Sequence, residues 1–188
     1  MKKIIRAFNP REVVVDTNGL GIGYADELIR EQQDEFGNIY EPLGFHNDEE
    51  FIKIQPKDAP RILYGIKASG SLNSKIHGNA YTRLNSGLVR FLIKDQEAKS
   101  ALLSTQIGQK MTAVQRIERL MPHEMTTKLF EEMANLRLKR TGASLDITLE
   151  QINPRYPKDK YSAFAYGLWR IKEIEEEQSK RRRRRGMG

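Results

Sequence analysis

The sequence contains no cysteine, which excludes disulfides, thiolate metal sites and cysteine nucleophiles. It also lacks an apolar run of the roughly 18 residues that a membrane span requires. No long apolar stretch follows the two lysines near the start, so the pattern predicts no signal peptide. With 188 residues, 38% of them hydrophobic and 30% charged, the chain fits one compact domain. We expect a cytoplasmic protein without a membrane partner.

The net positive charge is concentrated in one short segment. Six of the seven net positive charges lie in the run Lys180–Arg185, so the remainder of the chain is close to neutral. Such a dense run of like charge predicts a disordered basic tail over 179–188, following a folded domain over 1–178. Arginines bind phosphates well, so the tail is a candidate DNA-binding arm (Arg181, Arg182, Arg183, Arg184 and Arg185). A solubilising tail that binds acidic surfaces unselectively is the alternative interpretation.

Strand-like and helix-like segments alternate along the chain. A helix is expected to end before Asn9-Pro10, and three β-branched residues before Asp16 predict a strand buried on both faces. A glycine-rich turn and a helix from about 24 to 34, with Tyr24, Leu28 and Ile29 facing inward, follow it. This order indicates an α/β domain with a mixed or parallel sheet flanked by helices.

The rest of the sequence extends the same pattern. Residues 35–60 look irregular, and strands are expected at 62–66, 88–93 and 145–149. Helices are expected at 70–84, at 123–139, ended by Gly142, and at 159–178. The polar stretch 95–112 is expected to be partly mobile. These positions are taken from hydrophobic periodicity together with glycine and proline placement.

Asp16 is the first candidate functional residue. A carboxylate at the carboxyl end of a buried strand stands where α/β proteins place ligands, and Gly19, Gly21 and Gly23 allow close backbone approach. One interpretation is a metal-binding aspartate. A phosphate cradle is a second, although G-x-G-x-G departs from the dinucleotide fingerprint and no GK[ST] follows. An Asx turn or a helix cap is the third.

Asp159 is the second candidate, at the start of the last predicted helix between Lys158 and Lys160. Aspartate is common there through capping alone. If the small residues on the next turn pack on the sheet, Asp159 lies near Asp16. Two neighbouring carboxylates favour a divalent cation, and Mg²⁺ or Mn²⁺ prefers oxygen ligands. The two lysines are then candidate DNA-binding residues.

Histidine chemistry has weaker support. His46, His77 and His123 are scattered without metal-ligand spacing. No G-x-S-x-G motif supports a serine hydrolase. His77 lies in a polar predicted helix that faces DNA or solvent.

Four segments in order resemble the C-terminal RNase H-like nuclease domain of phage terminase large subunits. The stretch Val13–Leu28 is similar to that family's central strand and turn. The segments 63–74 and 86–93 resemble the next two strands and an intervening helix start. The segment 158–169 resembles the terminal helix, and the similarity covers about residues 1–178.

The resemblance implies an RNase H-like fold and two-metal cleavage of double-stranded DNA during viral genome packaging in a bacterial host cell. Asp16 matches the family's second acidic ligand and Asp159 its third, whereas the first ligand, the first strands and the ATPase domain have no counterpart. Implied partners are an upstream terminase part, the small terminase subunit and the portal. Asp26 and Asp146 are candidate substitute ligands. A non-catalytic DNA-binding or assembly module remains the alternative.

Overall fold

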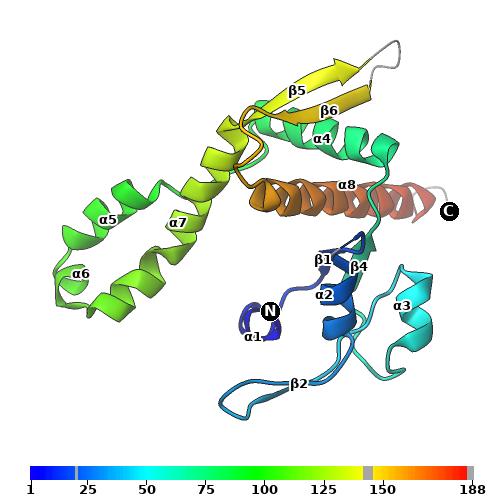
Figure 1. Ribbon diagram of the computed structural model, residues 1–188, viewed down its shortest axis with the longest axis horizontal. Helices are drawn as coiled ribbons and strands as arrows, with labels where there is room; N and C mark the ends of the chain where they lie inside the picture. The colour runs from blue at the N-terminus through cyan, green and yellow to red at the C-terminus, as the bar shows by residue number, and fades with distance from the viewer. Residues whose placement is uncertain (20, 142–145, 186–188) are drawn as a thin grey trace. The chain divides into compact units, whose positions relative to one another are not determined.

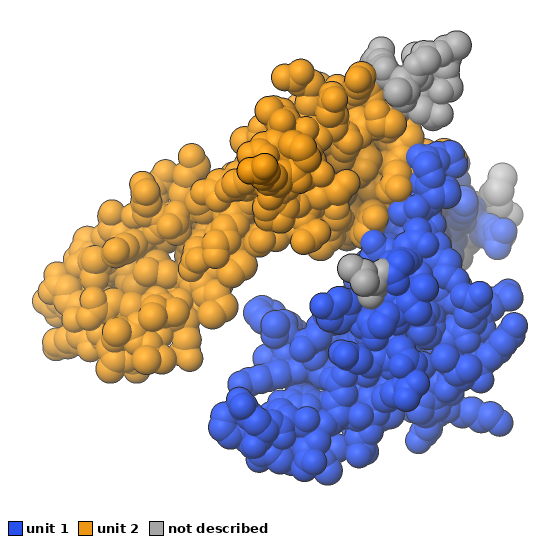
Figure 2. Space-filling view, viewed as in Figure 1, with its two compact units in different colours: residues 1–72, 170–188 blue, residues 73–169 orange. Residues whose placement is uncertain are grey.

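The computed structural model describes residues 1–19, 21–141 and 146–185 (Figure 1). The chain is mixed α/β and mainly helical. It divides into two compact units, residues 1–72 with 170–188 and residues 73–169 (Figure 2). The second unit is therefore inserted into the sequence of the first. Within the described ranges, no helix is long and apolar enough to cross a membrane.

A short parallel pair of strands forms the centre of the first unit. Helix α1 (Lys2–Phe8) ends at Asn9, which has a left-handed φ of 43° before Pro10. Strands β1 (Val13–Asp16) and β4 (Leu63–Ile66) then pair in parallel, with Val13 opposite Leu63 and Asp16 opposite Ile66. Both strands were predicted. Burial on both faces was not correct for β1, because Val13 and Val14 are only half-buried and β4 is its one strand neighbour among the described residues.

Helix α2 (Gly21–Leu28) packs against β1. It begins three residues earlier than predicted and is shorter. Ala25, Leu28 and Ile29 are buried, as expected for positions three and four apart on a helix. Tyr24, which was expected to face inward, is 59% exposed, because it lies at the edge of that stripe, beside Leu28 but turned away from Ala25 and Ile29.

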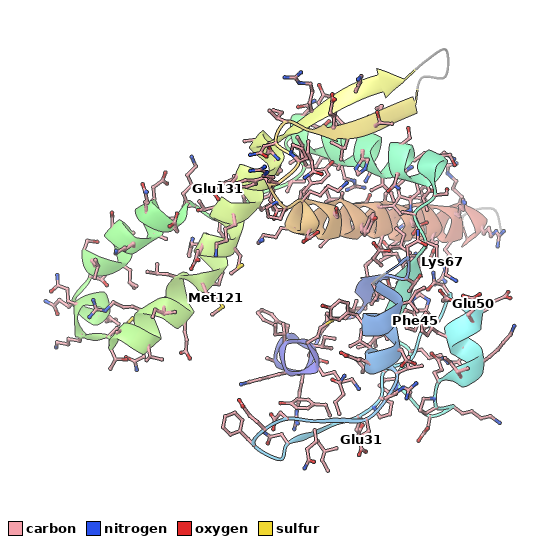
Figure 3. The ribbon with its side chains drawn as sticks, viewed as in Figure 1. Glu31, Phe45, Glu50, Lys67, Met121 and Glu131 are labelled. Carbon is pink, nitrogen blue, oxygen red and sulfur yellow. The ribbon has the colours of Figure 1, made fainter. Side chains whose placement is uncertain are left out.

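The core of the first unit joins β1, α2 and β4 with helix α3 (Glu49–Ile54) and the segment before it. Phe45 stacks on Phe51 with ring centroids 4.6 Å apart, and Figure 3 labels Phe45. Side-chain amides extend the sheet: Gln55 bonds the backbone N–H and C=O of Phe45, and Asn47 does the same for Gly65. The core cluster consists of Val15, Ala25, Leu28, Ile29, Phe45, Phe51 and Leu63.

The region predicted to be irregular, 35–60, contains regular structure. Strand β3 (Ile39–Tyr40) lies in it and pairs antiparallel with β2 (Gln32–Gln33), which occupies the end of the predicted helix 24–34. The turn between these strands is closed by Asp34, which accepts from the backbone of Phe36 and Asn38. Helix α3 (Glu49–Ile54) is capped by Asp48. Elements of two to six residues are too short to show a hydrophobic period in the sequence. They are determined instead by local caps and turns.

The second unit is built mainly from helices. It contains most of α4 (Gly70–Asn85), which confirms the predicted polar helix, then α5 (Asp95–Leu103) and α6 (Gln106–Lys110). Helices α5 and α6 lie in the stretch 95–112, which was expected to be partly mobile. Helix α7 (Ala113–Ala134) begins ten residues before the predicted start, at a capping box formed by Thr112 and Gln115, and passes through Pro122.

An antiparallel hairpin follows α7. Strand β5 (Leu136–Thr141) includes residues 136–139, which were predicted as the end of the helix. Strand β6 (Asp146–Gln151) confirms the predicted strand 145–149 with slightly later bounds. Leu136 and Leu138 alternate with basic residues, a period of two that favours a strand. Gly142 and Leu145, which were assigned to the helix end and the strand start, lie outside the described residues.

The predicted strand 88–93 is not a strand. Gly87 has a φ of 65° after α4, and Leu88, Leu92 and Ile93 are exposed. The segment is held instead by Phe91, whose ring lies 4.9 Å from that of Phe130 and 5.6 Å from that of Phe164. Aromatic packing therefore replaces a hydrogen-bonded ladder.

Helix α8 (Asp159–Arg185) is longer than the predicted 159–178. The run expected to be disordered continues this helix through Arg185. Glu176 and Glu177 stand four residues before Lys180 and Arg181, the spacing that stabilises helices. Cations are also favoured at a helix carboxyl end. These two effects explain why repulsion among the cations does not end the helix at 178.

Candidate functional site

Asp16 stands at the carboxyl end of β1, in the exposed turn to α2. One carboxylate oxygen accepts the backbone N–H of Asn18 at 3.0 Å, which is the Asx turn that was one of the three interpretations. The Asn18 amide in turn donates to Ala68 O at 3.3 Å. The second carboxylate oxygen has no partner among the described residues, so the turn leaves a ligand atom free.

Steric constraints explain why glycine occupies two of the positions after Asp16. A Cβ on Gly21 would lie 1.9 Å from the carbonyl oxygen of Asp16, so only glycine fits that position. Gly19 has a φ of 53°, in the left-handed region that favours glycine. Gly23 has open space around it. Two of the three glycines therefore shape the tight turn that carries Asp16.

Other polar groups gather at the carboxyl ends of these strands. Lys67, directly after β4, pairs with Glu50 and lies 3.5 Å from Asp48, and Figure 3 labels Lys67 and Glu50. The hydrogen bond to Glu50 is the main cause that raises the pKa of Lys67. Thr17 is 1% exposed, and its hydroxyl has no hydrogen-bond partner among the described residues.

Asp159 lies in the first turn of α8, in the second unit. It is exposed, and its carboxylate has no hydrogen-bond or ion-pair partner in the described part of the chain. Lys158 is also exposed, whereas Lys160 pairs with Glu132 at 3.1 Å. Of the two flanking lysines predicted to bind DNA, Lys160 is therefore already committed to an acid.

Glu132 organises the start of α8. This side chain on α7 is 1% exposed, and it accepts the backbone N–H of Tyr161 at 2.9 Å in addition to the Lys160 amine. It therefore caps the first turn of α8 from another helix. The sequence analysis missed Glu132. A charged residue three positions after Leu129, on the apolar stripe of α7, is the signal that marks it.

His77 packs against the same turn of α8. Its ring stacks on Tyr161 with centroids 5.7 Å apart, and its Nδ1 lies 3.4 Å from the tyrosine hydroxyl. Burial is the main cause that lowers the pKa of His77 to about 4, and the nearby charge of Lys158 adds to it. Burial also raises the pKa of Tyr161 to about 12. Both groups are thus uncharged at neutral pH.

The remaining histidines contact groups outside the two acidic positions. His46 Nε2 lies 3.2 Å from Glu12, without the alignment of a hydrogen bond. His123 Nδ1 lies 2.8 Å from Ile93 O. His46 lies beside Glu12 and beside β4, where its backbone N–H donates to Leu63 O, and His123 lies beside the 88–93 segment.

The predicted metal ligands are divided between the two units. Asp16 belongs to the first and Asp159 to the second. Asp26 pairs with Arg30 at 2.9 Å, and the Asp146 side chain lies outside the described residues. Among the described residues, no three His, Asp or Glu side chains gather as a metal site would require. Each unit thus carries one accessible carboxylate of the predicted pair, and a single carboxylate is too few for a metal centre.

A second polar cluster, which the sequence analysis also missed, joins α8 to the sheet of the first unit. Arg170 makes two hydrogen bonds to Glu12, at 2.7 and 3.0 Å, and lies 4.2 Å above the ring of Tyr64. It also pairs with Glu173 and Glu177. Hydrogen bonding to Arg170 is the main cause that lowers the pKa of Glu12. These contacts fix the carboxyl half of α8 in the first unit.

The basic end of α8 presents its charges to solvent. Lys180, Arg181, Arg182, Arg183 and Arg184 are exposed, and the Arg185 side chain lies outside the described residues. This arrangement leaves the guanidinium groups accessible to an anionic partner. The chain matches no family model, no curated protein and no solved structure.

Proposed function

We propose that the chain is the C-terminal part of a phage terminase large subunit nuclease with an RNase H-like fold. In this proposal it cleaves double-stranded DNA with Mg²⁺ or Mn²⁺ during genome packaging. Asp16 and Asp159 are the metal ligands. The missing acidic ligand comes from an upstream terminase part, and the small terminase subunit and the portal are further partners.

The observation that carries the proposal is the position of Asp16. It is the last residue of a parallel strand, it is exposed, and it has a free oxygen held in place by the turn at Gly21. Ligands bind at this edge of α/β sheets. Asp159, exposed and unpaired among the described residues, offers the second oxygen donor.

Oxygen donors are what Mg²⁺ and Mn²⁺ prefer, so the two side chains suit the proposed ions. A bound divalent ion would activate water and stabilise the leaving oxygen of a phosphodiester. The chain's own residues supply the rest. The Asx turn orients Asp16, and Glu132 fixes the turn of α8 that carries Asp159. Because two carboxylates do not complete a site, we expect little cleavage by this chain alone.

Plasmid cleavage tests this function. Supercoiled DNA with Mn²⁺ is incubated with the chain alone and with the chain plus the polypeptide encoded immediately upstream. We expect nicking only in the mixture, and we expect Asp16→Asn and Asp159→Asn to slow it on the order of a hundredfold or more. Full activity of both variants would contradict the site.

Asp58→Asn is the matched control for Asp16. Asp58 is exposed and precedes β4, so it lies toward the opposite end of the same sheet, and it has no hydrogen-bond or ion-pair partner within the described part of the chain. Its substitution should leave cleavage unchanged. If Asp58→Asn reduces cleavage as much as Asp16→Asn, general loss of negative charge, and not loss of a ligand, explains the result.

A distance measurement tests the pairing separately from activity. Because the chain has no cysteine, spin labels can be placed at Ile22→Cys and Ala163→Cys without background. In the mixture with Mn²⁺ replaced by the diamagnetic Mg²⁺, we expect one short and narrow distance between the labels. A broad distribution of long distances, unchanged by Mg²⁺, would contradict a shared site.

A non-catalytic DNA-binding module is the second candidate, favoured by the exposed basic end of α8. Each phosphate contact releases counterions, so binding should weaken steeply with salt. Under this alternative, the chain binds DNA equally with and without Mg²⁺, and deleting 180–188 abolishes binding. Asp16→Asn would then change neither binding nor its salt dependence.

A further inference from the structure

A pocket of about 540 Å³ opens in the first unit between α1, β3 and the segment that leads into β4. We call it the α1 pocket. In its wall, Ile62 directly precedes β4 and Pro10 lies three residues before β1, so the pocket lies at the amino ends of these strands, opposite to Asp16. Its lining includes Ile5, Leu43 and Ile62, and the charged side chains of Lys2, Arg6 and Glu41.

The floor of the α1 pocket is apolar and preformed. Ile5, Leu43 and Ile62 are partly buried and pack against the core cluster of the first unit. Their positions are therefore set by the core before any ligand binds. Tight packing behind the floor keeps it from collapsing into the pocket, and small-molecule sites commonly have volumes of about 300–1,000 Å³.

Lys2 holds the helix that forms one wall. Its side chain is buried, and its amine donates to the carbonyl oxygens of Arg30 and, at 2.8 Å, Glu41. Burial lowers the pKa of this amine. Because its donors are directed to backbone, Lys2 positions α1 and is not the charge that a ligand meets.

Arg6 is the accessible cation of the pocket. It is exposed, and its guanidinium has no hydrogen-bond or ion-pair partner in the described ranges. Tyr40 lies near it in the wall, and the Tyr40 hydroxyl donates to Asp34 at 3.0 Å. The Asp34 carboxylate also accepts from the amide of Asn38. Asp34 is thus engaged in its own turn, while Arg6 retains a complete set of donors.

We propose that the α1 pocket binds a small molecule with an apolar body and one carboxylate. The body covers Ile5, Leu43 and Ile62, and the carboxylate pairs with Arg6. The planar guanidinium matches a carboxylate through two parallel hydrogen bonds. The ion pair gives selectivity for an acid over an alcohol of the same shape, and the apolar floor gives affinity for both.

The test uses the full chain and two probes of one shape, 4-phenylbutyrate and 4-phenylbutan-1-ol. Dissociation constants are measured by NMR titration of the labelled chain, with the shifted amides identifying the site. We expect both probes to shift amides of α1 and β3, with the acid binding about tenfold more tightly. Arg6→Gln should remove this advantage while leaving the affinity of the alcohol unchanged.

Arg11→Gln is the matched control, because Arg11 is exposed, lies near α1 in sequence and does not line the pocket. It should leave both affinities unchanged. Ile39→Glu, at an exposed position of the wall, should weaken the acid more than the alcohol. The proposal is overturned if neither probe shifts α1 and β3, if acid and alcohol bind equally, or if Arg11→Gln weakens the acid as much as Arg6→Gln.

Discussion

The first unit and the α5–α7 part of the second unit bury their apolar residues to different degrees. In the first unit, seven side chains form one core cluster, and Phe45 is completely buried. On α7, by contrast, Val114, Ile117 and Met121 follow each other at helical spacing and remain exposed. Figure 3 labels Phe45 and Met121 in these two regions.

Polar contacts partly replace apolar burial along α5 and α7. Asp95 at the start of α5 bonds Thr127 of α7 at 2.8 Å, and Glu132 bonds the first turn of α8. Hydrogen bonds of this kind contribute about 1 kcal/mol each, less than a well-buried aromatic ring. We therefore expect the stability of the first unit to depend mainly on packing in its core. The stability of the α5–α7 region should depend more on individual hydrogen-bonded pairs.

The largest effect is expected from Phe45→Ala. Removing a fully buried ring should destabilise the first unit by about 3–5 kcal/mol through lost burial and the cavity left behind. Hydrogen exchange should show faster opening of β1 and β4, with α5–α7 unchanged. Val114→Ala, at a 65% exposed site, should stay within about 0.5 kcal/mol of the unmodified chain. Equal loss of protection in both regions would show one cooperative unit.

Arg170→Met should have the next largest effect, about 2–3 kcal/mol after allowance for partial exposure of Glu12. It leaves the carboxylates of Glu12, Glu173 and Glu177 without their shared cation. Urea unfolding measures the loss of stability, and hydrogen exchange in β1 and α8 locates it. The paired change with Glu12→Gln should cost less than the sum of the two single changes. Additive costs would mean that the two side chains are not coupled.

Glu132→Gln tests the corresponding contact in the second unit. The variant keeps the size of the side chain but loses its charge, so the bonds to Lys160 and to the Tyr161 backbone weaken. We expect a loss of about 1–2 kcal/mol, seen as faster exchange in the first turns of α8. Glu131→Gln, an exposed neighbour bonded to Tyr156, should change that exchange much less.

The smallest effect is a dependence on pH from His77. Its pKa is lowered from the ordinary value of 6.5 to about 4 in the folded chain, so the unfolded chain binds more protons between these values. The stability of the second unit should therefore fall as pH drops from 6.5 to 4, by about 1 kcal/mol after solvent screening. His77→Gln should flatten this dependence in urea unfolding curves. If the free energy of unfolding of His77→Gln still falls as steeply with pH, the dependence comes from other titratable groups.

The sequence predicted the parts of the fold that repeat a pattern over several residues. Strands β1 and β4, helix α4 and the start of α8 were located because β-branched runs and helical spacing are strong local signals. Asp16 was placed correctly at a strand end for the same reason. Whether it binds a metal stays a prediction.

The remainder depended on contacts that local patterns do not contain. The 88–93 segment has a strand-like composition, yet Phe91 packs on two other aromatic rings and no strand forms. Arg170 meets Glu12 across 158 positions of sequence, so neither residue signalled the other. The α1 pocket likewise requires three separate segments to come together.

The contact between Glu12 and Arg170 has a consequence for the order in which the protein is made. All of the second unit, residues 73–169, is synthesised between the two parts of the first. On the ribosome, β1 and β4 can pair early, but Glu12 and Tyr64 must wait for Arg170 to emerge. The second unit thus has the opportunity to fold while the first is still incomplete, and closing the long intervening loop costs less entropy once that segment is compact.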